Sequence, residues 1–164
     1  MGALQEGVVQ KWARDVTLRP GVDRGELELF VDRHGFELPD SLRDLYLLAD
    51  GSSDCIDYVH FWPLDEIAPV EPKWRTAPEH RTLFGVADYL VHSHAFAIQL
   101  DPARHDHGAV YINWYSKRHG FDLVALDYEE LLGKYVDNSA LLCVPSAYVP
   151  PAPLPTARAR FPRR

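Results

Sequence analysis

Residues 23–67 constrain the fold more than any other part of this chain, because they predict an ordered series of elements. Asp23 and Glu26 have the spacing of a reciprocal helix N-terminal cap, and apolar residues follow from Leu27 at helical spacing. The residue before a proline is pushed out of the α region. Pro39 therefore predicts the end of this first helix.

A second helix is predicted to follow directly, with Asp40 as its N-terminal cap. Its apolar residues share one face: Leu42, Leu45, Tyr46 and Ala49. Asp50-Gly51 then predicts the stop, because glycine takes the left-handed conformation that helix ends commonly need. Residues 56–62 are rich in β-branched and aromatic side chains and predict a strand.

The remaining chain predicts more strands and two further helices. The predicted strands are residues 83–91, 95–100, 109–115 and 121–126, and residues 68–81 are expected to form a long surface loop. A short amphipathic helix is expected at residues 4–14. The last helix, from Tyr128, is expected to start with a reciprocal cap between Asp127 and Glu130. Together these elements predict a single α+β domain, with a mostly antiparallel sheet of about five or six strands flanked by N-terminal helices and one C-terminal helix.

The order of motifs over residues 23–137 resembles the SUKH superfamily, named for fungal cell-wall-assembly and killer-toxin-resistance proteins. The matching segments are Leu38-Pro39, residues 42–46, Asp50-Gly51, Trp62-Pro63-Leu64-Asp65-Glu66-Ile67, residues 84–88, residues 89–101 and residues 128–135. The chain departs from the family pattern at Ser52-Ser53, where a second glycine is frequent, and at Val91-His92-Ser93-His94, where smaller turn residues are expected.

The resemblance implies a protein-binding module without a cofactor. Bacterial members are best known as immunity proteins of polymorphic toxin systems, so the resemblance implies one-to-one binding and neutralisation of a cognate toxin. Two alternatives remain open. One is a regulatory scaffold that binds host proteins, as in the fungal branch, and the other is a metal-dependent hydrolase built on histidine pairs.

Charge and composition divide the chain into three segments. Residues 1–22 are expected to form an N-terminal helical segment, residues 23–144 the SUKH-like domain, and residues 145–164 a flexible tail rich in Pro, Ala and Arg. The segment from Pro151 holds four of the 17 basic residues and none of the 24 acidic ones, so residues 1–150 carry a net charge of −11. This acidic charge argues against nucleic-acid binding and favours a cationic protein partner, such as a toxin domain.

Other features predict a cytoplasmic protein that is a monomer or a weak dimer. Apolar runs are too short for a membrane span, and a secretory signal is not visible. Two cysteines, Cys55 and Cys143, favour reduced thiols over a disulfide scaffold, although a single bridge between them stays open.

Acidic and aromatic residues alternate after the second predicted helix, and this pattern is typical of an interface with anchoring rings inside a charged rim. The candidate partner-binding residues are Asp50, Asp54, Asp57, Tyr58, Trp62, Asp65 and Glu66. The alternative interpretation is a solvated acidic surface with cap residues. Either Phe61 or Trp62 is expected in the core, since alternate strand residues face inward.

Histidines provide the one signal typical of an enzyme. His92 and His94 form one H-x-H pair and His105 and His107 another, and His92, His94 and His107 could supply three zinc ligands. Both pairs fall at predicted turns, where solvated polar residues are ordinary. The sequence has no phosphate-binding glycine loop and no nucleophile elbow. We therefore predict a protein that is not an enzyme and holds no metal.

Overall fold

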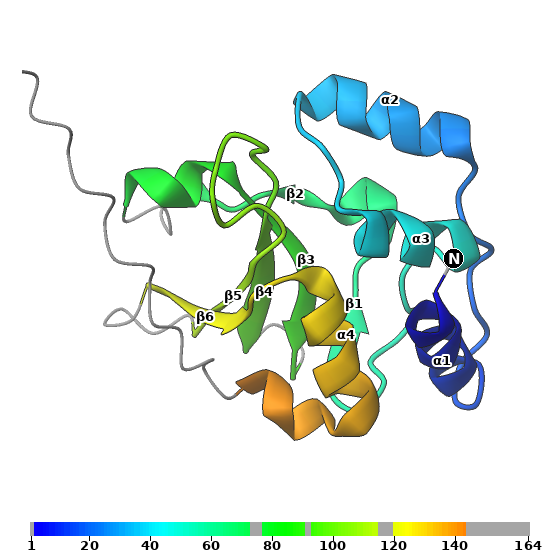
Figure 1. The fold of residues 1–164 in the computed structure, drawn as a ribbon. Coiled ribbons are helices and arrows are strands. Elements are labelled where there is room, and N and C mark those ends of the chain that lie inside the picture. The colour runs from blue at the N-terminus through cyan, green and yellow to red at the C-terminus, as the bar shows by residue number, and fades with distance from the viewer. Residues whose placement is uncertain (1, 73–76, 91–92, 115–119, 144–164) are drawn as a thin grey trace, which may run out of the picture.

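The computed structural model describes residues 2–72, 77–90, 93–114 and 120–143. Within these ranges the chain forms one α+β domain with four α-helices and a six-stranded antiparallel sheet, as the sequence predicts (Figure 1). The helices are α1 (Ala3–Trp12), α2 (Arg24–His34), α3 (Asp40–Leu48) and α4 (Tyr128–Asp137). The strands are β1 (Val59–Phe61), β2 (Ala68–Pro69), β3 (Leu83–Tyr89), β4 (His94–Gln99), β5 (Val110–Asn113) and β6 (Phe121–Ala125).

Two short strands share one edge of the long strand β3. The sheet order is β1-β3-β4-β5-β6, and β2 pairs with β3 beside β1. Phe61 of β1 lies opposite Ala87, whereas Ala68 of β2 lies opposite Gly85. Between β1 and β2 the chain leaves the sheet through the short 3-10 helix Leu64–Glu66.

Helices α1, α3 and α4 cover one face of the sheet, and the core lies between them (Figure 1). Phe61 of β1 contacts a ring from each end of the chain, with centroid distances of 5.1 Å to Trp12 and 5.0 Å to Tyr135. Phe96 and Ile98 of β4 are buried on the same side. The predicted N-terminal helical segment thus forms a helix from Ala3 to Trp12 that shares this core.

Helix α2 stands apart from the other helices (Figure 1) and begins with the predicted reciprocal cap. Glu26 N donates to Asp23 Oδ1 at 2.8 Å, and Asp23 N donates to Glu26 Oε2 at 2.9 Å. A cluster of rings joins α2 to the start of β3, because Phe36 lies 5.6 Å from Phe30 and 4.4 Å from Phe84.

One predicted helix end was wrong, one predicted cap is absent, and a third is formed only in part. The first helix ends at His34 because Gly35 takes a φ of 68°, four residues before Pro39. Asp40 does not cap α3, since Pro39 occupies the cap position and the Asp40 carboxylate instead accepts from Arg43 at 3.1 Å. At α4, Asp127 accepts from Glu130 N at 2.8 Å as predicted, but the Glu130 carboxylate returns its bond to Leu126 N.

The strand predicted over residues 56–62 is interrupted by a tight turn. Ile56 and Val59 exchange both backbone hydrogen bonds, at 2.8 and 3.0 Å, and the central residues Asp57 and Tyr58 have φ values of 50° and 70°. Positive φ at both central positions defines the turn that matches the twist of a hairpin. The loop predicted over residues 68–81 was also wrong in part, because it contains β2 and the 3-10 helix Pro78–Thr82.

Candidate functional site

Small residues occupy the sheet face that points away from the core helices. Because strand residues alternate, Phe96 and Ile98 face the core, and Ala95 and Ala97 face the opposite side. Gly85 of β3 lies opposite Ala97 in the ladder, and Asn113 of β5 lies opposite Ala95. These four residues, which lack large side chains, form a low floor across three strands.

Larger side chains surround this floor and make a hollow of about 270 Å³, here called the open-face groove. Trp62 and Phe121 provide aromatic walls, and Glu66 and Glu71 contribute carboxylates. The Trp62 ring lies directly on Gly85: a Cβ added to this glycine would be 2.4 Å from Trp62 Cζ3. The absence of a side chain at position 85 therefore makes room for the wall.

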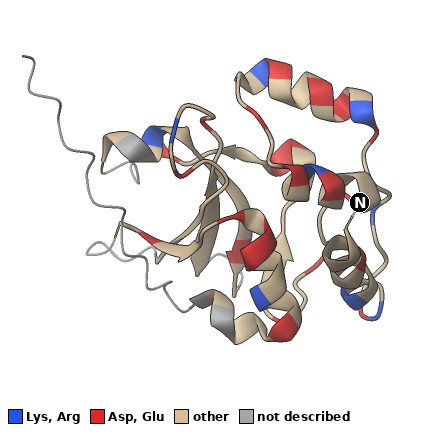
Figure 2. Ribbon diagram, in the orientation of Figure 1, with Lys and Arg blue, Asp and Glu red and all other residues tan. Residues whose placement is uncertain are grey.

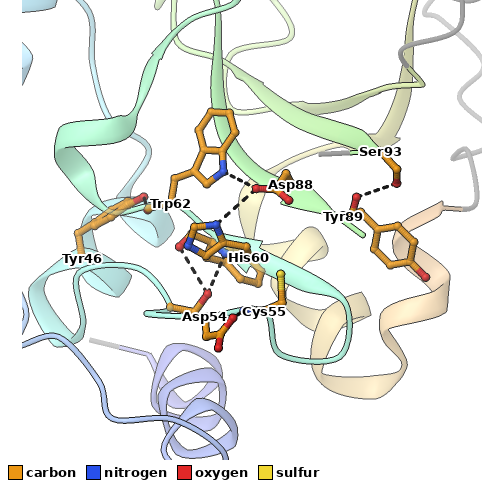
Figure 3. Close-up of polar contacts among 10 residues, drawn as sticks. Tyr46, Asp54, Cys55, His60, Trp62, Asp88, Tyr89 and Ser93 are labelled. Atoms are coloured by element: carbon orange, nitrogen blue, oxygen red, sulfur yellow. Dashed lines mark hydrogen bonds and ion pairs between the residues drawn. The ribbon is translucent and has the colours of Figure 1, made fainter. Parts of the chain in front are cut away.

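A buried carboxylate holds Trp62 in position. Asp88 is 1% exposed, and its Oδ2 accepts from Trp62 Nε1 at 2.8 Å (Figure 3). The same oxygen lies 3.4 Å from His60 Nδ1. Burying a carboxylate is costly unless it is hydrogen-bonded, so the bond to Trp62 stabilises both groups.

The backbone of Trp62 is also fixed by hydrogen bonds, at both its N–H and its carbonyl. Trp62 N donates to Val86 O at 3.0 Å, and the Tyr46 hydroxyl donates to Trp62 O at 2.6 Å. Burial raises the pKa of Tyr46, which keeps this hydroxyl protonated as a donor. Trp62 is thus the partly exposed member of the predicted aromatic pair, and Phe61 is the core member, as expected.

We expect Gly85→Ala to displace the Trp62 ring and lower the free energy of unfolding by about 1–3 kcal/mol, the usual cost of overpacking. The Trp62 indole N–H signal in an NMR spectrum should move, because the bond to Asp88 would be strained. Gly133→Ala in α4 is the matched control, since a Cβ there meets nothing within 4 Å. A helical glycine replaced in open space should make the protein slightly more stable. Equal effects of the two substitutions would show that Trp62 does not depend on Gly85.

The predicted partner-binding residues separate into different places. Trp62 and Glu66 line the open-face groove. Asp50 and Asp65 line a different hollow, beside α2, and Asp50 is structural because its Oδ1 accepts from Leu64 N at 2.7 Å. Asp54 accepts from the backbone N of Cys55 at 2.7 Å.

Asp57 and Tyr58 form the turn before β1, at the opposite end of this strand from Trp62. Tyr58 is 63% exposed, and its carbonyl accepts from Leu90 N at 2.8 Å. Leu90 also has a positive φ, of 51°, and is 46% exposed. Asp57 Oδ2 forms an ion pair with Lys11 Nζ at 2.7 Å. Tyr58 of this turn and the adjoining Leu90 therefore present two exposed large side chains on a strained backbone, separate from the open-face groove.

The predicted histidine site is divided between the two ends of β4. His94 starts this strand, and burial lowers the pKa of His94, which lies 4.7 Å from Trp114 between ring centroids. His107 lies beyond the other end, with Nε2 3.1 Å from Glu37 O. His94 and His107 therefore do not share one ion, and His92 lies outside the described residues. Among the residues that the structure describes, no group of three His, Cys, Asp or Glu side chains is arranged to hold a metal.

A larger hollow, of about 520 Å³, lies between α2 and α3. Acidic and basic residues alternate along it, including Arg24, Glu28, Arg43 and Asp44, as the ribbon coloured by charge illustrates (Figure 2). A surface with charges of both signs favours neither a cationic nor an anionic partner. The open-face groove differs because, among the residues that the structure describes, the charged ones that line it are Glu66 and Glu71, which have one sign and lie beside aromatic walls.

Some predictions concern parts of the chain beyond the described residues. The Pro/Ala/Arg-rich tail, residues 145–164, falls there entirely, as does the Cys143 side chain, so pairing with the exposed Cys55 stays open. No helix within the described ranges combines the length and apolar character needed to span a bilayer. Comparison with known proteins returned neither a matching family model nor a matching curated protein. The resemblance to the SUKH superfamily therefore stays a prediction.

Proposed function

We propose that this protein is a binding module that neutralises a cognate toxin by one-to-one association, as immunity proteins do. The open-face groove is the observation that carries this proposal. It combines aromatic walls, Trp62 and Phe121, with the carboxylates of Glu66 and Glu71. Rings inside a charged rim are the usual composition of an interface anchor.

The size of the groove is compatible with one side chain inserted by a protein partner. Sites for drug-sized ligands and cofactors usually measure about 300–1,000 Å³. At about 270 Å³, the open-face groove suits a single inserted side chain. A toxin that inserts a side chain from beside its own active site would have that site covered by the surface around the groove.

The acidic charge of the chain supports a cationic partner. Residues 1–150 carry −11, and acidic residues lie on α2, α3 and α4 as well as at the groove (Figure 2). A field of one sign speeds encounters with an oppositely charged protein, whereas desolvated contacts slow its release.

The test uses the C-terminal domain of a toxin encoded beside this protein, purified separately. Adding one equivalent of the protein should abolish the toxin's activity. The double variant Glu66→Gln/Glu71→Gln should associate more slowly, by about two- to tenfold at low salt, because it loses two attractive charges. The loss should shrink as salt rises, since the Debye length falls from about 30 Å at 0.01 M to about 8 Å at 0.15 M.

Glu129→Gln/Asp137→Asn is the control, because it removes the same charge from exposed positions on α4, against the other face of the sheet. Stopped-flow or surface-binding kinetics of both variants separates a local effect from one of net charge. Full toxin activity at excess protein would refute the proposed function. Identical association rates for the two variants would remove the groove from the interface.

A further inference from the structure

We propose that the open-face groove is a subsite for one arginine side chain of the protein partner, an inference that rests on the proposed function. Its ligand would be the planar guanidinium group, stacked on the Trp62 indole between the carboxylates of Glu66 and Glu71. Three observations carry this assignment: the fixed indole, the charges around it, and the small floor.

The fixed indole favours a flat cation. Trp62 is held by Asp88 at its Nε1 and by Tyr46 and Val86 at its backbone, so its ring needs little ordering when a ligand stacks on it. Tryptophan is the best aromatic partner for a cation over its face. Arginine stacks on such a face through its plane and is less strongly hydrated than lysine.

The described charges around the ring favour a positive ligand. Glu66 and Glu71 line the groove, and the buried Asp88 carboxylate lies directly behind the indole N–H (Figure 3). A donor polarised by a carboxylate leaves more electron density on its own ring, which strengthens the attraction of that ring for a cation. Acidic and neutral side chains lack this attraction.

The floor sets the size of the ligand. Gly85, Ala95 and Ala97 leave a hollow of about 270 Å³, equal to about nine water molecules at the volume of liquid water. This volume accommodates a guanidinium and part of its aliphatic stem. The stem can lie on the methyl groups of Ala95 and Ala97, since long cationic side chains cover apolar surface with their methylenes.

The experiment uses three small probes: the amides of Nα-acetyl-arginine, Nα-acetyl-lysine and Nα-acetyl-citrulline. Each is titrated into the full-length protein, and the indole N–H signal of Trp62, assigned with Trp62→Phe, is followed by NMR. The arginine amide should shift this signal saturably. The lysine amide should bind about two- to fivefold more weakly, and citrulline, which has the same shape without the charge, should bind at least as weakly as lysine. Equal shifts with citrulline, or no saturable shift with arginine, would overturn the proposal.

Variants test the same site from the protein side. Glu66→Gln/Glu71→Gln should weaken binding of the arginine amide by at least about threefold, whereas Glu129→Gln/Asp137→Asn should leave it unchanged apart from a small effect of net charge. Ala95→Leu should abolish binding by filling the floor. If Ala95→Leu fails to fold, the Glu66→Gln/Glu71→Gln variant still tests the proposal, because both residues are exposed and both substitutions are isosteric.

The outcomes distinguish this inference from the proposed function. If the protein neutralises its toxin but does not bind the arginine amide, the proposed function is supported and the arginine subsite is refuted. If the protein binds the arginine amide at Trp62 but leaves every toxin encoded beside it active, the subsite is supported and the immunity function is refuted.

Discussion

Gly51→Ala is expected to lower the free energy of unfolding by about 2–5 kcal/mol, from about 1–2 kcal/mol of left-handed backbone strain and about 1–3 kcal/mol of overpacking. Gly51 has a φ of 69°, and an added Cβ would lie 2.6 Å from Phe61 O and 2.7 Å from Pro63 N. Both atoms belong to backbone and cannot rotate away. The substitution would push α3 and β1 apart at the point where Asp50 and Trp62 are positioned. Urea unfolding followed by circular dichroism measures the loss.

Gly35→Ala separates the two contributions. Gly35 has nearly the same φ, 68°, but a Cβ there meets nothing within 4 Å. It should therefore show the conformational cost alone, about 1–2 kcal/mol. If the two substitutions lower the free energy of unfolding equally, the close approach of Gly51 to β1 does not contribute to the loss of stability.

Trp12→Ala is expected to cost about 3–5 kcal/mol, the usual loss when a large aromatic side chain is removed from a core. Trp12 is fully buried and packs on Phe61, while the neighbouring Lys11 Nζ donates to Tyr135 O at 2.9 Å. Helix α1 therefore connects to both β1 and α4. Thermal and urea unfolding should show one cooperative transition at lower stability.

Leu29→Ala is the control for loss of a large apolar side chain, because Leu29 is mostly exposed on α2. Its effect should stay within about 0.5 kcal/mol. A Trp12→Ala protein as stable as the Leu29→Ala protein would mean that residues 1–22 contribute little to the core.

The sequence predicted those elements whose signals are local. The cap formed by Asp23 and Glu26 spans four residues, and the structure contains both of its hydrogen bonds. The turn at Asp57-Tyr58 shows the opposite case. Hairpin turns of this kind usually carry Asn-Gly, so an aspartate and a tyrosine within an aromatic run predict a strand. Here Lys11, 46 residues earlier in the chain, pairs with Asp57 and supports the turn.

The candidate site was predicted in part, for the same reason. Trp62 and Glu66 belong to a recognisable motif and were expected at a partner surface, and both line the groove. Its floor depends on how three strands align, including the register shift between Gly85 and Ala87. Asp88 reaches Trp62 from 26 residues away. No local pattern in the sequence specifies either relation.

The divided edge beside β3 offers few backbone groups for strand pairing with another molecule. A long unpaired strand at the margin of a sheet offers a row of backbone donors and acceptors to the next molecule. Here that margin consists of three residues in β1 and two in β2, and Pro69 has no backbone N–H to donate. The intervening chain departs into a 3-10 helix. Within the described residues, this side of the sheet is therefore short and interrupted, and it is a poor template for an intermolecular strand.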